Sequence, residues 1–594
     1  MVYSRAIDIL LIVAVLAVPT VLGDLWAYNL SLVYLYAIAT LGVGLCWGQA
    51  GFLPLGQGMF LGLAAYMSGL GLIHVAGGVW GWLLVVPVVI VPGVLAFVIG
   101  LLIFRGRTES GPFFALITLA MTLLAFQIAT AWNSVTGGFN GLRNIPDLAG
   151  MSDFTDRYYI AGVALILAVA FCMWLIEAPI GVVWRALSQN ERRIAFFGYS
   201  TATLKAAAFG AAGLLAGFAG FLYAPQQNLV TPTLAGFVVS ANLVIWAAVG
   251  GRGSAIGPAL GAVLVGVLST ELRDGGGFGG GLEALWDFLA RFWEAVVAGF
   301  FIIVVLFLPN GIAGLFAKLN ASLKRLGRLP FRPILAPPVR TEGAAGPPAL
   351  ALSGCRVAAG EVRILNGLTL RLDRAAIYCL IGPNGAGKTS TFNTLSTELR
   401  MQEGEIRLDG EVISGAAADT LAAKGIGRKF QIPSVFPNLT IADNLHVALW
   451  GTRARLVSLL RPSLRRWDTP LLATLRERFP FLAQRDRIAG DLSHGERQVL
   501  ELAMALAAEP RLLLLDEPCA GLSHEDTRQV IDAILWAREE LGLTVLLIEH
   551  DMSLVREIAD HVFVMHQGAL LAEGDVAAVQ ADDKVREVYV GMAS

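Results

Sequence analysis

The chain has 594 residues, of which 56% are hydrophobic and only 15% are charged. Soluble proteins contain about 25% charged residues, so the composition argues against an ordinary soluble enzyme and indicates a membrane protein. The formal net charge is −2 at pH 7. With no basic surplus, we expect no nucleic-acid partner. The five cysteines are scattered and odd in number, which does not predict a disulfide framework.

Long apolar runs dominate the chain up to about residue 310. A helix needs about 20 apolar residues to cross a membrane. The runs therefore predict an all-α polytopic membrane domain over residues 1–316 with about ten transmembrane helices. The expected spans are residues 5–23, 25–47, 53–73, 79–104, 112–132, 158–178, 203–223, 236–249, 257–270 and 292–308.

Two details of these spans carry further expectations. No small-residue cleavage pattern follows the first run before Asp24, so we expect a retained helix rather than a signal peptide. The short spans 236–249 and 257–270 flank a glycine-rich turn, as interrupted helices near a transport pathway often do.

Several polar side chains lie inside or beside the apolar runs, where lipid contact would be costly. They could line a route for a polar solute, or they could hydrogen-bond between helices. They are Gln49, Gln57, Gln127, Asn133, Thr136 and Asn140.

Basic residues gather in loops that alternation of the spans places on one face of the membrane. Cytoplasmic loops carry the excess of lysine and arginine, so this face is expected to be cytoplasmic. Residues 317–347, which are basic and proline-rich, are expected to form a cytoplasmic linker. We expect a multi-pass protein of the bacterial inner membrane, in contact with lipid, whose last domain, residues 348–594, is cytoplasmic.

The cytoplasmic loop over residues 184–200 is polar, has helical character and ends near Gly198. A short helix there could dock in a groove of the last domain and carry motion into the membrane. An ordinary amphipathic connector is the alternative, and the domain downstream favours the docking helix.

Residues 348–594 have the mixed charge and periodicity of a soluble α/β domain. An apolar strand over 377–381 runs into a phosphate-binding loop followed by a helix. Lys388 is expected to neutralise the β/γ-phosphate charge of ATP, and Thr389 to offer its hydroxyl to Mg²⁺. The expected ATP-binding residues are Gly382, Pro383, Asn384, Gly385, Ala386, Gly387, Lys388, Thr389 and Ser390.

A second apolar strand, over residues 512–515, ends in two carboxylates. We expect Asp516 to support Mg²⁺ and Glu517 to act as the general base toward water. His550 follows a third strand, over 544–548, and is placed to contact the γ-phosphate. A lone histidine is more often structural, but this order of parts favours a catalytic role.

Two further motifs carry a resemblance to a known family. Residues 492–498 (LSHGERQ) begin a helix that Ser493 caps. With Gly495 and Glu496 at an anion-binding helix start, they resemble the signature motif of ABC ATPases. Gln431 resembles the glutamine of the loop that links nucleotide to permease, and the resemblance assigns it to hydrolysis and to Mg²⁺.

The resemblance implies an α/β P-loop ABC ATPase domain with a helical subdomain. In that family two cassettes pair head to tail, and each ATP lies between the phosphate loop of one and the signature of the other. We therefore expect a second permease/ATPase half, either a copy of this chain or a paralogous subunit. Two departures stand out: no aromatic residue lies near Ala359 to stack on adenine, and Ser523 replaces a common aspartate.

The membrane half is similar to permeases of the branched-chain amino acid and urea importer group. The motifs are TGGFNGL at 136–142, the loop through Glu191 and Gly198, VGGRGS at 249–254 and LFLPNG at 306–311. Residues 244–253, 427–431, 492–496 and 587–591 resemble the urea and short-chain amide type most closely.

This resemblance implies an ATP-driven importer subunit that receives solute from a periplasmic or extracellular binding protein. The expected solute is urea or a short-chain amide, and the alternative is a branched-chain or other amino acid. An exporter or lipid flippase usually has six spans per cassette, against about ten here. A nucleotide-regulated channel would not need Glu517 and His550.

Overall fold

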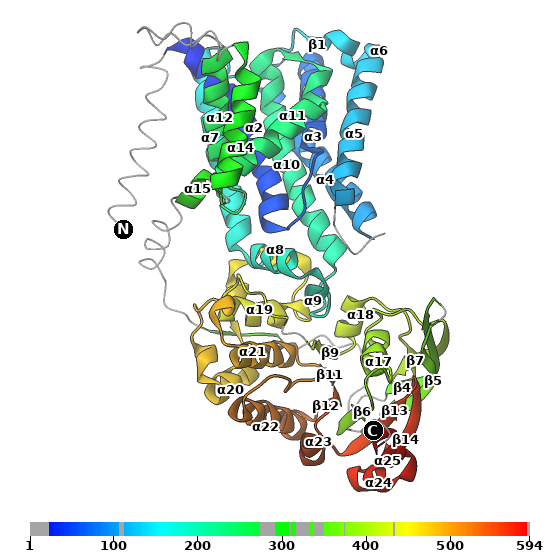
Figure 1. The fold of residues 1–594 in the computed structure, drawn as a ribbon. Helices are drawn as coiled ribbons and strands as arrows, with labels where there is room; N and C mark the ends of the chain where they lie inside the picture. The colour runs from blue at the N-terminus through cyan, green and yellow to red at the C-terminus, as the bar shows by residue number, and fades with distance from the viewer. Residues whose placement is uncertain are drawn as a thin grey trace. The chain divides into compact units, whose positions relative to one another are not determined.

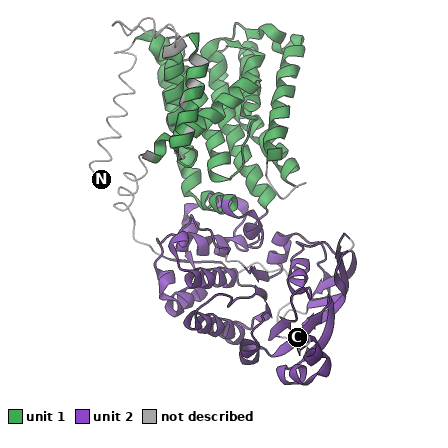
Figure 2. Cartoon of the chain, in the orientation of Figure 1, with its two compact units in different colours: residues 1–188, 201–331 green, residues 189–200, 332–594 purple. Residues whose placement is uncertain are grey.

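The computed structural model describes residues 23–75, 77–105, 112–273, 291–308, 310–315, 333–337, 350–360, 362–372, 375–431 and 434–590. The chain divides into two compact units (Figure 2). Unit 1 comprises residues 1–188 and 201–331, and unit 2 comprises residues 189–200 and 332–594. The expected span 5–23 lies outside the described residues apart from Gly23, as does the expected linker apart from residues 333–337.

Unit 1 is a bundle of apolar helices (Figure 1). Every expected span from 25–47 onward overlaps one of them. The helices are α2 (Asp24–Gly44), α3 (Gln57–Val75), α4 (Val85–Arg105), α5 (Pro112–Ala131), α7 (Phe154–Glu177), α10 (Thr201–Gln227), α11 (Phe237–Gly250), α12 (Gly257–Arg273) and α14 (Trp293–Phe307).

Six apolar helices of the described chain are long enough to cross a membrane, namely those beginning at Asp24, Gln57, Trp80, Pro112, Phe154 and Thr201. Helices α11 and α12 are shorter apolar helices. The helices of the bundle differ in burial. In an 18-residue apolar stretch, 83% is buried in the helix that begins at Asp24 but only 22% in α5, so α2 lies nearer the centre of the bundle and α5 at its rim. Figure 1 shows α5 at the edge of the bundle.

Glycine permits the close approach of helices at the centre of unit 1. A Cβ atom on Gly220 of α10 would lie 2.5 Å from the carbonyl oxygen of Leu61 on α3. One on Gly213 would lie 2.6 Å from the carbonyl oxygen of Pro92 on α4. Small residues that let backbones touch are a usual source of packing energy between helices in lipid.

Three of the polar side chains in the apolar runs bond to backbone carbonyls within unit 1. The amide of Gln57 donates to the carbonyl oxygen of Ala212 at 2.6 Å, and that of Gln49 to Gly253 at 3.2 Å. The hydroxyl of Thr136 donates to the carbonyl oxygen of Ala129 at 2.6 Å. These contacts favour the packing interpretation over the solute route at these positions.

Unit 2 has two main sheets and a small parallel pair of β3 (Ile334–Leu335) and β10 (Trp467–Asp468). The larger has the order β14-β13-β6-β12-β11-β9, parallel except for β14, and the smaller is antiparallel with the order β5-β4-β7-β8. The strands are β4 (Leu350–Ala359), β5 (Val362–Leu372), β6 (Ile377–Ile381), β7 (Glu403–Leu408), β8 (Glu411–Val412), β9 (Ile426–Lys429), β11 (Leu512–Asp516), β12 (Thr544–Ile548), β13 (His561–His566) and β14 (Ala569–Gly574).

The central strands are continuous apolar runs because they are buried on both faces of the sheet. Every residue of β6, β11 and β12 is buried. Since these strands are parallel, the segments that follow them meet at one edge of the sheet. That edge receives the glycine-rich loop, the Asp516–Glu517 pair and the turn after Ile548.

Helices flank the strands of unit 2 (Figure 1). They include α17 (Lys388–Leu395), α19 (Ile441–Gly451), α20 (Pro470–Arg478), α21 (His494–Ala507), α22 (His524–Leu541) and α23 (Met552–Ile558). Helices α19 and α20 lie between β9 and α21 in the chain. The order of a helical membrane-like region before an α/β domain agrees with the predicted fold class.

Candidate active site

The loop between β6 and α17 is shaped by glycine. Gly382, Gly385 and Gly387 have φ angles of 149°, 82° and 98°, where residues with a side chain are strained. A Cβ atom on Gly382 would also lie 2.3 Å from the carbonyl oxygen of Met565. The sequence GPNGAGK therefore folds into a tight turn with its backbone N–H groups ahead of a helix start, which is a geometry that suits phosphate.

Lys388, the first residue of α17, folds back over this loop. Its Nζ atom donates to the carbonyl oxygens of Gly382 at 2.7 Å and Pro383 at 3.1 Å. Burial lowers the pKa of Lys388, and the nearby carboxylates of Glu517 and Asp516 oppose that shift. The loop thus holds a cation beside two acidic side chains.

Asp516 ends β11 and is 1% exposed. Among the described residues its buried Oδ1 atom has no hydrogen-bond partner. Burial raises the pKa of Asp516, and the guanidinium of Arg428 opposes that shift. An unsatisfied buried carboxylate oxygen is costly unless it receives a cation or a donor.

Asp516 shares a cleft of about 560 Å³ with Thr389 and Gln431. The structure thus brings together the three residues that the sequence assigns to Mg²⁺. A hydroxyl, an amide oxygen and one carboxylate are hard oxygen donors, and Mg²⁺ is usually held by few carboxylates together with phosphate oxygens. The donor set and the orphaned oxygen fit that ion.

Glu517 is the meeting point of the three expected catalytic side chains. Its Oε1 atom lies 2.8 Å from Nε2 of His550, and its Oε2 atom accepts from Nε2 of Gln431 at 2.9 Å. The φ angle of Glu517 is 45°, a left-handed value that is uncommon for a residue with a long side chain. Such local strain concentrates at functional sites, where the surrounding structure enforces it.

Glu549 belongs to the same edge of the sheet, and the sequence interpretation gives it no role. It is 6% exposed, and its carboxylate accepts from the backbone N–H groups of Cys519 and His550, each at 3.4 Å. Burial raises its pKa to about 7. An acidic residue directly after the apolar run TVLLI was the available signal, because such a position is costly without partners.

The expected signature residues lie at the start of α21. Ser493 caps the helix by accepting from the N–H of Glu496 at 3.1 Å, and Glu496 accepts from the N–H of Ser493 at 2.8 Å. Arg487 pairs with Glu496 at 2.7 Å, and a Cβ atom on Gly495 would lie 2.6 Å from Asp526. Neither Ser493 nor Gly495 lines the cleft of Thr389 and Asp516.

Residues 189–200, which include α9 (Glu191–Ala195), pack into unit 2. The side chain of Asn190 donates to Ser434 at 2.8 Å, and the hydroxyl of Tyr199 donates to the carbonyl oxygen of Val447 at 2.9 Å. The side chain of Arg193 is fully buried. The predicted short helix is therefore present and seated among the residues that follow β9.

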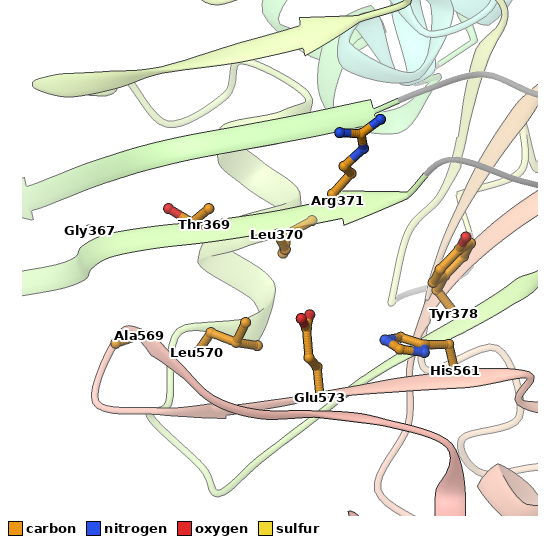
Figure 3. Close-up of a pocket in the computed structure, with 9 residues that line it drawn as sticks. All are labelled: Gly367, Thr369, Leu370, Arg371, Tyr378, His561, Ala569, Leu570 and Glu573. Atoms are coloured by element: carbon orange, nitrogen blue, oxygen red, sulfur yellow. The ribbon is translucent and has the colours of Figure 1, made fainter.

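A second hollow of about 680 Å³ lies between β5 and the β13–β14 hairpin (Figure 3). Its walls include Thr369, Arg371, Tyr378, His561 and Glu573. None of its lining residues belongs to the glycine-rich loop or to the Glu517 cluster. It is therefore separate from the candidate active site.

Comparison with known proteins places both parts of the chain. The family described as the permease component of the branched-chain amino acid transport system matches residues 26–306, and the ABC transporter family matches residues 365–520. The high-affinity branched-chain amino acid transport ATP-binding protein BraF of Pseudomonas aeruginosa is 37% identical over 252 residues, which cover 41% of this chain and 99% of that protein. The chain belongs to the ABC transporter family.

Other similarities of this ABC transporter chain follow the same pattern. The ATP-binding protein LivG of Escherichia coli, named for high-affinity branched-chain amino acid transport, is 36% identical over 252 residues, or 41% of this chain and 99% of that protein. A crystal structure of a nucleotide-free ATP-binding cassette from an ABC transporter is 26% identical. The match covers 41% of this chain and 98% of the chain in the crystal structure, with a TM-score of 0.36.

The predicted fold class and enzyme class are confirmed. This ABC transporter chain fuses a helical permease to an α/β ABC ATPase. It binds ATP and is an ATPase whose hydrolysis is coupled to transport. The permease match and the long apolar helices make it a membrane protein.

Proposed function

We propose that this ABC transporter chain is one half of an importer, and that hydrolysis occurs at Glu517. The main support is that both carboxylate oxygens of Glu517 are hydrogen-bonded, one to His550 at 2.8 Å and the other to Gln431 at 2.9 Å. A general base must be oriented toward the water whose proton it accepts. The two partners come from different segments and restrict the orientation of the carboxylate, which supports this role.

The other residues of the site divide the remaining work. The loop over residues 382–387 binds the phosphates of ATP through its backbone N–H groups, which Pro383 lacks, and Ser390 lies in the first turn of α17. Lys388 neutralises the β/γ-phosphate charge, and His550 contacts the γ-phosphate as charge develops there. Thr389, Gln431 and Asp516 hold Mg²⁺, which neutralises phosphate charge when bound.

The signature residues act on a second half. Ser493, Gly495 and Glu496 lie at a helix start, which favours anions. They line no described cleft with Thr389, so we propose that they reach the nucleotide bound by a partner cassette. That partner is a second copy of this chain or a paralogous subunit.

The domain plan follows the same proposal. Residues 1–316 form the permease, 317–347 the linker and 348–594 the ATPase. The permease lies in the inner membrane of a bacterial cell, and the ATPase lies on the cytoplasmic side. A periplasmic or extracellular binding protein delivers the solute. The basic loops and the need for cytoplasmic ATP support this orientation.

The transported solute is small and polar. The motifs at residues 244–253 and 492–496 favour urea or a short-chain amide. The names of BraF and LivG refer to branched-chain amino acids, and their identity of 36–37% supports an amino acid at least as well. Both remain within the proposal of an importer.

The proposal is tested by measuring solute uptake into energised cells. The cells express the full chain together with the partner half and the binding protein. We expect accumulation of labelled urea, acetamide or leucine that disappears in Glu517→Gln. Efflux of a preloaded solute that requires Glu517 would contradict import. Solute entry that persists in Glu517→Gln would contradict ATP-driven transport.

A further inference from the structure

Glu501, in the middle of α21, joins three segments of unit 2 that are far apart in the sequence. Its side chain is fully buried. Oε1 lies 3.6 Å from Nη1 of Arg193 on α9 and accepts from the backbone N–H of Phe430 at 3.2 Å. Oε2 lies 3.8 Å from Nζ of Lys429 at the end of β9. One carboxylate therefore contacts the docked segment (residues 189–200), the end of β9 and the residue before Gln431.

Arg193, the partner of Glu501, is a buried arginine whose guanidinium is only partly hydrogen-bonded. Nη1 of Arg193 also donates to the carbonyl oxygen of Arg428, and its guanidinium lies 4.7 Å from the ring centre of Phe197. Among the described residues, Nε and Nη2 of Arg193 have no hydrogen-bond partner. Burial lowers the pKa of Arg193, and Glu501 opposes that shift.

Stability alone gives a weak reason for this charged pair. A buried ion pair can often be replaced by apolar side chains without loss of stability, because desolvation offsets the attraction. Here the offset is large, since two guanidinium nitrogens and Oε2 of Glu501 lack hydrogen bonds within the described chain. A costly pair that persists beside an active site points to a role in function.

The contacts around Phe430 connect the pair to hydrolysis. The ring of Phe430 packs edge-on against Phe196 with centres 5.3 Å apart, and the guanidinium of Arg428 lies 4.7 Å from its centre. The next residue is Gln431, whose amide donates to Glu517. Arg193, Glu501 and Phe430 therefore form a continuous chain of contacts that leads to Gln431.

We propose that Glu501 is a positioning residue for ATP hydrolysis. It holds the N–H of Phe430 and the guanidinium of Arg193 together, so that the amide of Gln431 stays on Glu517. Because Glu501 lies in the helix that the signature residue Ser493 caps, the same carboxylate ties this helix to residues 189–200. The inference rests on the proposed roles of Gln431 and Glu517.

The test is a set of variants in the full chain, reconstituted in lipid nanodiscs with any subunits that co-purify. Glu501→Gln removes the charge with little change of shape. We expect kcat to fall at least tenfold while KM for ATP changes less than twofold. Adding Glu501→Gln to the Gln431→Ala variant should change the rate of single-turnover hydrolysis of radiolabelled ATP less than twofold. The reason is that Gln431→Ala has already removed the contact between residue 431 and Glu517.

Glu509→Gln is the matched control. Glu509 lies just beyond the C-terminal end of α21 and pairs at 2.6 Å with Arg453, whose side chain is 1% exposed. Its loss also deprives a buried arginine of its carboxylate, but this pair lies outside the chain of contacts from Arg193 to Gln431. We expect kcat within twofold of the wild type for this variant.

Either of two comparisons with the other variants would overturn the inference. One is an equal fold loss from Glu501→Gln with and without Gln431→Ala, and the other is a loss in Glu509→Gln as large as in Glu501→Gln. If Glu501→Gln does not fold, the double variant Arg193→Met/Glu501→Gln, with neither charge, decides by the same kcat criterion. Wild-type kcat in a folded Glu501 variant, with Glu517→Gln inactive, would reject this inference and leave the proposed function standing.

Discussion

Glu517 and His550 approach to 2.8 Å between Oε1 and Nε2, at the ends of neighbouring parallel strands. The amide of Gln431 holds the other oxygen of Glu517 from a third segment. Both oxygens of this carboxylate are therefore hydrogen-bonded, which restricts its orientation. This constraint makes Glu517 the side chain on which hydrolysis should depend most strongly.

Glu517→Gln should lower kcat for ATP hydrolysis by at least about 100-fold, because general bases contribute about 10²–10⁴-fold. Gln retains the shape and one acceptor oxygen, so affinity for ATP should stay within about threefold of the wild type. Hydrolysis is measured by phosphate release, and binding by displacement of a fluorescent ATP analogue. Glu525→Gln, an exposed change on α22, is the control. Unchanged phosphate release from Glu517→Gln would remove it from the role of base.

Asp516→Asn tests the proposed metal position. The buried Oδ1 atom of Asp516 has no partner among the described residues, which fits a cation-binding role. An amide binds Mg²⁺ more weakly than a carboxylate, so the Mg²⁺ concentration for half-maximal hydrolysis should rise at least tenfold. Asp532→Asn, exposed on α22, should leave the Mg²⁺ titration unchanged. Coincident titrations for Asp516→Asn and the wild type would place the ion elsewhere.

The parts of the site that follow from local patterns could be predicted from the sequence. The loop at 382–390 and the pair after residue 515 each depend on a strand and a turn within about ten residues. The capping box of Ser493 and Glu496 is equally local. Apolar run length likewise predicts the helices from α2 to α14, although a count of spans does not follow from it.

The contacts that depend on packing could not be predicted in this way. Nothing local indicates that Arg193 reaches Glu501, because the two residues meet only after β9, α9 and α21 are assembled. The sequence marks Glu549 as acidic next to an apolar run, but its burial against Cys519 depends on the order of strands in the sheet. A motif predicts a residue's chemistry more readily than its partners.

Glu549 should make the stability of the ATPase depend on pH. Its carboxyl is 6% exposed, and burial raises its pKa from 4.5 to about 7. Between these values the folded state binds more protons than the unfolded state, so stability falls as pH rises through the window. The penalty is complete above pH 7 and is about 3 kcal/mol, from 1.36 kcal/mol for each pH unit. Glu549→Gln cannot ionise and escapes it.

The measurement is the apparent Tm of unit 2 in the full chain between pH 5 and 8. The wild type should lose several degrees relative to Glu549→Gln across that range. Glu540→Gln, which changes an exposed carboxylate on α22, should follow the wild type. Parallel profiles for Glu549→Gln and the wild type would mean that Glu549 ionises normally in the folded protein.

Gly451→Ala should dislodge residues 189–200 from their seat in unit 2. Gly451 ends α19, and a Cβ atom there would lie 1.8 Å from the carbonyl oxygen of Phe197. Because the obstacle is backbone rather than the end of a flexible side chain, the segment itself must move. Arg193 is fully buried in the wild type, so trypsin should cleave after it at least fivefold faster in the variant. Gly253→Ala, whose added methyl group would meet no atom within 4 Å, should leave that rate unchanged, and equal cleavage in all three proteins would show that the segment is not seated through Gly451.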